Sequence, residues 1–385
     1  MNKSPGKNLD LKFVTVSFLI ITLLNFTVTS ISHFLLKSAN FPYRDFLISY
    51  KLPFFLTSLG NFDGAHYISI ARYGYRNFEQ AFFPLYPALI RLLGGFFHKN
   101  YFISAILISN IAFFLGLIFF YLFLQRHYDK KKIPWIFSFF LLFPASFFLD
   151  SVYSTSLFFL FSFATLFFIE EEKSLPAFFM GIIASLSRIT GILMLIPIFF
   201  ILLNKGTLKD YKHSIPVLLG PIVGLALYCL FLFLTTGDPL AFYSSQPAFG
   251  SNRSTHIILI PQVLYRYIKI FTTSNFNFQY FIAVVEFLTF ILIFIFLLYK
   301  LRILLKKKNK DYTMVGLAIY SLSVLILPTF TGTFSSILRY AVLGYSTFLF
   351  LGLLKSRFIR IILLTIFLIL HVIFLALFSQ GYFIG

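Results

Sequence analysis

The chain has 385 residues, of which 59% are hydrophobic and only 12% are charged, and 57 of them are phenylalanine. Soluble globular domains do not have this composition, so the sequence predicts a polytopic membrane protein. The net charge of +19 could suggest a nucleic-acid partner. However, the lysines and arginines fall in short clusters between apolar runs, as the positive-inside rule predicts for cytoplasmic loops. We therefore expect the lipid bilayer as a partner and no nucleic acid.

Apolar runs long enough to cross a bilayer divide the first half of the chain. We expect an all-α bundle of about 11 transmembrane segments, within a range of about 9 to 13, because a span needs roughly 20 apolar residues. The first run lacks a small-residue cleavage site after it, so we expect a retained helix with a cytoplasmic N-terminus and no signal peptide. The expected segments are 13–31, 101–124, 133–149, 152–169, and two short ones within 175–203 that meet at Arg188.

The second half of the chain continues this pattern. Its expected segments are 215–235, 280–299, 313–327, 340–354 and 358–378. Two long extracytoplasmic loops are expected, a first at 33–100 and a second at 236–279. No internal repeat or low-complexity linker separates any part of the sequence, so residues 1–385 are expected to form a single domain. Cys229 is the one cysteine, which excludes a disulfide framework and a thiolate metal cluster.

The stretch Asn61–Arg91 gathers polar side chains in an otherwise apolar chain. Pro84 and Pro87 prevent a helix from running straight through it, so we expect a folded loop at a membrane surface. A carboxylate at the edge of a membrane is costly, which makes Asp63 a candidate functional residue. The alternative is that Asp63 caps a helix that starts at Gly64. The two roles are compatible, because a capping carboxylate is held in one place.

The order of motifs resembles the family of the GPI mannosyltransferase that adds the second mannose, together with its prokaryotic relatives. That family has an aromatic residue before an Asp, then a Gly-Tyr pair, then an aromatic FPLYP block. Here these read Phe62 and Asp63, Gly74 and Tyr75, and Phe83 to Pro87. Phe62 stands where relatives usually have Trp. In a later block, residues 143–159, Thr155 stands where relatives often have Glu, which leaves the position of a second carboxylate open.

The resemblance implies a GT-C glycosyltransferase of the plasma membrane that acts at the extracytoplasmic face. Such an enzyme transfers a hexose, typically mannose, with inversion from a polyprenyl-phosphate sugar to a glycolipid, glycan or protein acceptor. It uses no nucleotide sugar and no cofactor. Asp63 would be the general base, and a pKa raised by partial burial would strengthen it.

The departing lipid phosphate would need cationic hydrogen-bond donors near the membrane surface. Arg188 in SLSRITG and Arg339 in SSILRY match family positions of this kind. The plainer interpretation of both is that they extend to lipid headgroups. His66 would share a helical face with Asp63. The further candidates for substrate binding are Arg72, Tyr75, Gln246, Arg253 and Tyr340.

Two alternatives remain from the sequence. A metal site is not expected, because the seven histidines are scattered and a metal would need several ligands at compatible spacing. A transporter or flippase of lipid-linked sugars would also need many spans and interior charges. Such a protein should show paired repeats with Gly or Pro breaks at matching positions, and the sequence has neither.

Overall fold

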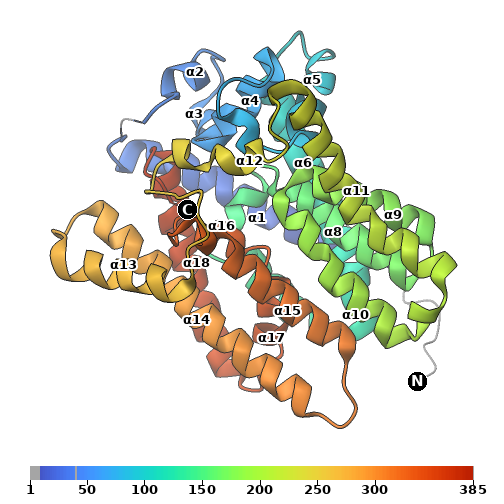
Figure 1. The fold of residues 1–385 in the computed structure, drawn as a ribbon. Helices are drawn as coiled ribbons and strands as arrows, with labels where there is room; N and C mark the ends of the chain where they lie inside the picture. The colour runs from blue at the N-terminus through green and yellow to red at the C-terminus, as the bar shows by residue number, and fades with distance from the viewer. Residues whose placement is uncertain (1–8, 40, 385) are drawn as a thin grey trace.

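The computed structural model describes residues 9–39 and 41–384, and the regular structure in these residues is entirely helical (Figure 1). Within them, six helices are long and apolar enough to cross a membrane. This confirms an all-α membrane protein, while the finer count of about 11 spans stays a prediction. The six are α1 (Leu11–Leu35), α6 (Tyr101–His127), α11 (Tyr211–Thr236), α14 (Phe278–Lys306), α15 (Tyr312–Ile326, continued by a 3₁₀ turn to Thr331) and α18 (Arg357–Ser379).

The remaining expected segments are shorter helices with breaks between them. The segment at 133–149 ends early, because Pro144 lacks a backbone N–H and follows the end of the helix. The run 175–203 divides at Arg188, as predicted. These helices are α7 (Ile133–Leu141), α8 (Thr155–Glu170), α9 (Ser174–Ser187), α10 (Leu195–Lys205), α16 (Ile337–Ala341) and α17 (Tyr345–Gly352).

The two expected external loops fold into short helices. Helices α2 to α5 gather at the top of Figure 1, and we call this region the α4 end of the molecule. The first loop forms α2 (Arg44–Ile48), α3 (Phe54–Thr57), α4 (Asp63–Tyr73) and α5 (Leu85–Gly94). The second forms α12 (Ala241–Ser244) and α13 (Ile260–Thr273).

Helix packing is close where small residues meet. Helix α11 lies along α9, and a Cβ added at Gly224 would come within 2.4 Å of the carbonyl oxygen of Ile182. Only glycine allows this approach of two backbones, which is a common way for helices to associate in a bilayer.

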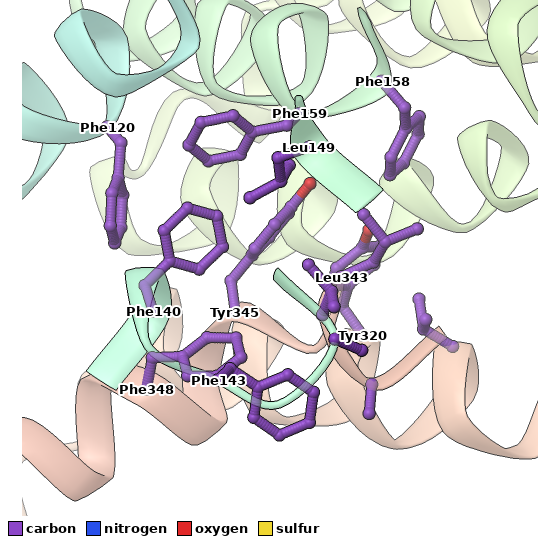
Figure 2. Close-up of a cluster of buried hydrophobic side chains, with 14 of the residues drawn as sticks. Phe120, Phe140, Phe143, Leu149, Phe158, Phe159, Tyr320, Leu343, Tyr345 and Phe348 are labelled. Atoms are coloured by element: carbon purple, nitrogen blue, oxygen red, sulfur yellow. The ribbon is translucent and has the colours of Figure 1, made fainter. Parts of the chain in front are cut away.

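The centre of the bundle is built from aromatic rings (Figure 2). The ring centroids of Phe140 and Phe159 lie 4.8 Å apart, and those of Phe163 and Tyr345 lie 4.7 Å apart. Tilted and offset ring pairs at this spacing pack favourably. This core joins α6, α7, α8 and α17, and it therefore fixes the turn between α7 and α8 that leads to the site described below. Its labelled members are Phe120, Phe140, Phe143, Leu149, Phe158, Phe159, Tyr320, Leu343, Tyr345 and Phe348.

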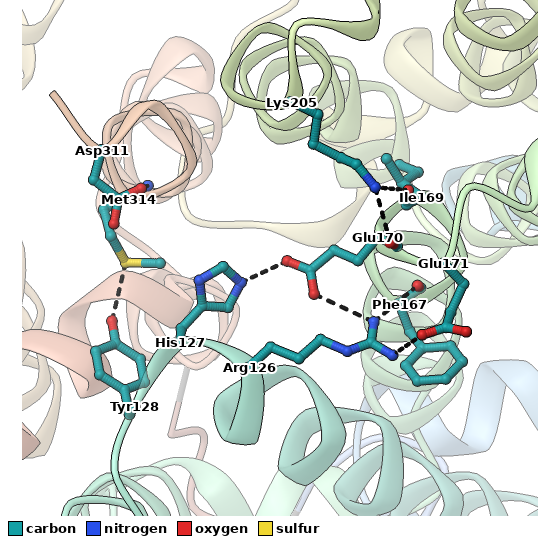
Figure 3. A network of polar contacts seen from close by, with 10 residues as sticks. All are labelled: Arg126, His127, Tyr128, Phe167, Ile169, Glu170, Glu171, Lys205, Asp311 and Met314. Atoms are coloured by element: carbon teal, nitrogen blue, oxygen red, sulfur yellow. Dashed lines mark hydrogen bonds and ion pairs between the residues drawn. The ribbon is translucent and has the colours of Figure 1, made fainter. Parts of the chain in front are cut away.

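A network of charged side chains joins the ends of α6, α8 and α10 (Figure 3), and we call it the Glu170 network. Arg126 donates to the Oε2 atom of Glu170 at 3.3 Å and also pairs with Glu171. His127 lies 2.5 Å from the other Glu170 oxygen. The Nζ atom of Lys205 donates to the Glu170 carbonyl oxygen at 2.9 Å. Each charge in this network therefore meets an opposite charge or a helix-terminal carbonyl.

Candidate functional site

A cavity of about 580 Å³ lies at the α4 end, within the size range of ligand pockets. Most of its lining comes from four parts of the chain: α4, the break at Arg188, α12 with the loop after it, and the stretch from the end of α15 to α16. The segments before α2 and after α4 and the C-terminal end add further residues. We call it the main cavity. Its acidic, basic and histidine lining side chains are Asp63, His66, Arg188, Arg253 and Arg339.

Asp63 is the first residue of α4, one position earlier than expected. The residue before it, Phe62, has φ 58° and ψ −116°, a backbone conformation that side chains other than glycine rarely adopt. Such strain often marks functional sites. The prediction that Asp63 caps the helix is wrong, since no side chain caps α4. Instead, the Asp63 carboxylate accepts a hydrogen bond from Nη1 of Arg339 in an ion pair.

This ion pair sets the protonation state of Asp63. Burial raises the pKa of Asp63, but the charge and hydrogen bond of Arg339 outweigh it, and the net shift is downward. The expectation of a raised pKa is therefore wrong for the free protein. The physical reason is that an opposite charge in direct contact favours the ionised carboxylate. Asp63 is ionised at neutral pH and is a weak base as long as Arg339 stays bound to it.

Arg339 is held among aromatic rings. Its guanidinium carbon lies 5.5 Å from the ring centroid of Tyr153 and 5.9 Å from that of Phe148. Burial lowers and Asp63 raises the pKa of Arg339, with an upward net result, so it stays charged. Its Nε atom is buried and has no hydrogen-bond partner among the described residues. A buried donor without a partner is costly.

Arg188 occupies the extended residue between α9 and the following 3₁₀ helix. Its Nη1 atom donates to the hydroxyl of Thr155 at 3.0 Å, and its guanidinium lies 5.6 Å from the ring centroid of Tyr340. Arg188 is 9% exposed and lines the main cavity. This burial is the opposite of an arginine extended to lipid headgroups. Arg188 is joined to a neutral hydroxyl, and it forms no ion pair within the described part of the chain.

Arg253 and Gln246 approach the cavity from the second loop. Nη1 of Arg253 donates to Oε1 of Gln246, and Nη2 donates to the hydroxyl of Ser336, both at 3.3 Å. Ser336 has φ 70° and directly precedes α16, which carries Arg339. Both predicted residues therefore line the main cavity, and Arg253 contacts the turn that presents Arg339.

Glu286 supports the same turn from inside α14. Its Oε1 atom accepts the backbone N–H of Ser336 at 3.2 Å, and its Oε2 atom accepts the hydroxyl of Tyr267 at 2.9 Å. Glu286 is not among the site residues predicted from the sequence. The signal was present, because a single acid in an apolar spanning helix of 29 residues is expensive. The partner of that acid could not be read from the sequence.

His66 lines the main cavity on the same helical face as Asp63, as predicted. Its Nδ1 atom lies 3.4 Å from Oε1 of Glu79, and its ring stacks on Phe82 at 4.9 Å. Glu79 also accepts the backbone N–H of Arg76 at 2.9 Å. The buried Glu79 thus holds the His66 ring in place.

Two predicted residues lie elsewhere. Tyr75 donates its hydroxyl to the Phe82 carbonyl at 2.7 Å and does not line the main cavity. Arg72 lies near the opposite end of α4 from Asp63, with its guanidinium 4.9 Å from the centroid of the Tyr73 ring. The reason is helical geometry, since successive turns of α4 carry Arg72 away from the cavity.

The question of a second carboxylate has a structural answer. Asp150 is 1% exposed and accepts a hydrogen bond from Asn25 at 2.8 Å, away from the cavity lining. Among the described residues, Asp63 is the one acid that lines the main cavity. No group of three or more His, Cys, Asp or Glu side chains in these residues could hold a metal ion.

Comparison of the chain with protein-family models, with curated proteins and with solved structures finds no match. The resemblance noted above therefore rests on motifs within this sequence alone.

Proposed function

We propose that the protein is a membrane glycosyltransferase that transfers a hexose, with mannose as the sugar to test first, from a polyprenyl-phosphate donor to an acceptor hydroxyl. One observation carries the proposal: a single carboxylate, Asp63, shares a cavity with three arginines. Transfer from a lipid phosphate requires one base for the acceptor and several cations for the leaving group. The motifs around Asp63 and Arg339 support the same conclusion independently.

In this proposal, Asp63 is the general base of a single displacement. The acceptor hydroxyl oxygen attacks the anomeric carbon of the sugar and forms the new glycosidic bond. The bond from that carbon to the phosphate oxygen breaks, and its electron pair leaves on the phosphate. The hydroxyl proton moves to Asp63. Attack from the side opposite to the leaving group inverts the anomeric carbon.

The Asp63–Arg339 ion pair gives the base a way to respond to the donor. Arg339 is the main cause of the lowered pKa of Asp63. A donor phosphate would compete for the same guanidinium, because charge-assisted bonds to phosphate and to carboxylate are similar in kind. As Arg339 shifts its hydrogen bonds to the phosphate, the pKa of Asp63 rises. The carboxylate then becomes a stronger base when the donor is in place.

The test is transfer of radiolabel from polyprenyl-phosphate-mannose in membranes. Wild type and Asp63→Asn are compared at equal expression, and Asp238→Asn is the matched control. Asp238 does not line the main cavity, and among the described residues its carboxylate accepts hydrogen bonds from the Leu240 N–H and the Ser244 hydroxyl. Loss of general-base catalysis typically costs about 10² to 10⁴ in rate. We expect that loss for Asp63→Asn and wild-type transfer for Asp238→Asn.

Other outcomes would reject parts of the proposal. If Asp63→Asn transfers as fast as wild type, Asp63 is not the base. If wild type moves the labelled lipid across the bilayer and forms no new glycosidic bond, the protein is a flippase of lipid-linked sugars. If wild type gives no product with mannose or with any other polyprenyl-phosphate hexose, the donor class is wrong.

A further inference from the structure

A second cavity of about 570 Å³ lies between the end of α4 and the beginning of α6. It shares no lining residue with the main cavity. None of its lining residues is acidic, and it is rich in basic and phenolic side chains. These side chains are Tyr50, Arg72, Tyr73, His98, Lys99 and Tyr101. We call it the basic cavity.

The backbone holds the basic side chains of this cavity in an unusual turn. His98 and Lys99 both have positive φ, 50° and 64°. Two adjacent non-glycine residues in this region cost conformational energy. The turn is fixed by the backbone N–H of Lys99, which donates to the Gly94 carbonyl at 2.9 Å, and by that of Asn100, which donates to Phe97 at 2.8 Å. This turn places His98 and Lys99 beside Arg72.

The beginning of α6 adds to the positive potential. Helix α6 has 27 residues, and its first turn lies at the cavity through Tyr101. The N–H groups of a helix N-terminus favour anions. The side chain of Asn100 accepts only the N–H of Ile103, at 3.1 Å. The cavity therefore combines a helix N-terminus with two full cations and no neutralising carboxylate in its lining.

The position of the basic cavity points to a ligand in the membrane. It lies at one end of α6, a helix long enough to cross a bilayer, so it lies at the level of lipid headgroups. Large apolar side chains just before the basic turn reach outward: Leu92 is 69% exposed and Phe96 is 78% exposed. Apolar side chains beside basic ones match the boundary between acyl chains and anionic headgroups.

We propose that the basic cavity binds the phosphate of an anionic membrane lipid. Arg72 and Lys99 donate charge-assisted hydrogen bonds to the phosphate oxygens, the tyrosine hydroxyls offer further donors, and Leu92 and Phe96 contact the acyl chains. The site does not depend on the proposed transferase activity. It lies away from the main cavity, because Arg72 follows Asp63 by nine residues, or roughly 14 Å along α4.

The test measures which lipids stay bound to the full-length protein. Protein in nanodiscs of mixed phosphatidylglycerol and phosphatidylcholine is released into the gas phase, and retained lipids are counted by native mass spectrometry. Wild type is compared with Arg72→Gln/Lys99→Gln. The matched control, Lys37→Gln/Lys269→Gln, removes two cations that lie outside the cavity lining. A charge-conserving variant, Arg72→Lys/Lys99→Arg, separates loss of charge from misfolding.

We expect wild type to retain phosphatidylglycerol in preference to phosphatidylcholine. In Arg72→Gln/Lys99→Gln, this preference should fall by about tenfold or more, which corresponds to about 1.4 kcal/mol. The control and charge-conserving variants should keep the wild-type preference. Equal loss in the control variant would overturn the proposal, because bulk charge would then explain binding. No loss in the cavity variant would overturn it as well. Displacement of the lipid by millimolar glycerol phosphate would overturn the assignment to a membrane lipid, because a soluble phosphate would then be the better ligand.

Discussion

The Glu170 network and the main cavity differ in how their basic side chains are matched by carboxylates. In the Glu170 network, Arg126 pairs with two carboxylates and His127 with one (Figure 3). Lys205 also pairs with the neighbouring Glu172 at 2.9 Å. In the main cavity, three arginines share one carboxylate. The first arrangement is complete without a ligand. The second leaves positive charge next to an open volume.

Under the proposed function, the charges of the Glu170 network stabilise the fold and those of the main cavity bind the substrate. Buried cations that lack an opposite charge are costly, which is consistent with a ligand-binding role for Arg188 and Arg253. Substitutions in the main cavity should therefore reduce activity, and those in the Glu170 network should reduce stability.

After Asp63 itself, the largest effect is expected at Arg339. Arg339→Gln removes the partner of Asp63 and a donor to the leaving phosphate, and we expect transfer to fall by about 10² to 10³. Arg339→Lys should recover only part of this, since a lysine cannot reproduce the two-pronged guanidinium geometry. The measurement is the initial rate of mannose transfer, with amounts of folded protein matched by size-exclusion chromatography. Full activity of Arg339→Gln would contradict the assignment.

A smaller effect is expected at Glu286, which holds the turn before Arg339 without lining the main cavity. Glu286→Gln keeps the shape but weakens the bond to the Ser336 N–H. We expect kcat to fall by about ten- to a hundredfold through misplacement of Arg339, with KM for the acceptor unchanged.

The partner residue supplies the control for Glu286. Tyr267→Phe removes the other bond of the same carboxylate and should lower kcat in the same direction by less. If both variants lower thermal stability and leave kcat per folded protein unchanged, Glu286 has only a structural role.

The opposite pattern is expected at Arg126. Arg126→Gln leaves Glu170 with fewer donors and should destabilise the protein by about 1 to 3 kcal/mol, the range for hydrogen bonds to charged groups. Transfer per folded protein should stay at the wild-type level. Thermal unfolding in detergent and the transfer assay together check this. A transfer rate that falls as steeply as that of Arg339→Gln would remove the contrast between the two regions.

The smallest effect is a dependence of stability on pH. Burial raises the pKa of Glu170. The hydrogen bond from His127 and the charges of His127 and Arg126 lower this pKa by more than burial raises it, so the net shift is downward. A lowered pKa contributes stability above the unfolded-state value, about 4.3 for Glu, and that stability is lost as pH falls through the folded value. Unfolding temperature should therefore drop below about pH 4, and less steeply in Arg126→Gln. Equal slopes would contradict the role of the pair.

Much of the fold could be predicted from the sequence because long apolar runs become helices in a membrane protein. The predicted segments at 13–31 and 101–124 match α1 and α6 within a few residues. The predicted break at Arg188 is also present. The segment at 133–149 was harder to predict, because Pro144 falls inside an unbroken apolar run and only the fold shows where the helix resumes.

The site was less predictable, because its contacts join distant parts of the chain. Asp63 and Arg339 were both proposed, but their ion pair spans 276 residues, and it reversed the expected pKa shift. Arg72 and Tyr75 belong to the same polar loop in sequence, yet helical geometry turns them away from the main cavity. For Glu286, the sequence shows an acid inside an apolar helix, but it does not show that this acid binds the turn at Ser336.

The most direct test separates donor binding from transfer in one variant. Binding of a polyprenyl phosphate to purified wild type and Asp63→Asn is titrated in detergent, and sugar transfer is measured on the same samples. Asp63→Asn removes a negative charge and frees Arg339. We therefore expect the variant to bind the polyprenyl phosphate at least as tightly as wild type and to transfer sugar at least about 10² times more slowly. If the variant loses both binding and transfer, Asp63 is a structural residue. If it keeps both, Asp63 is not the general base.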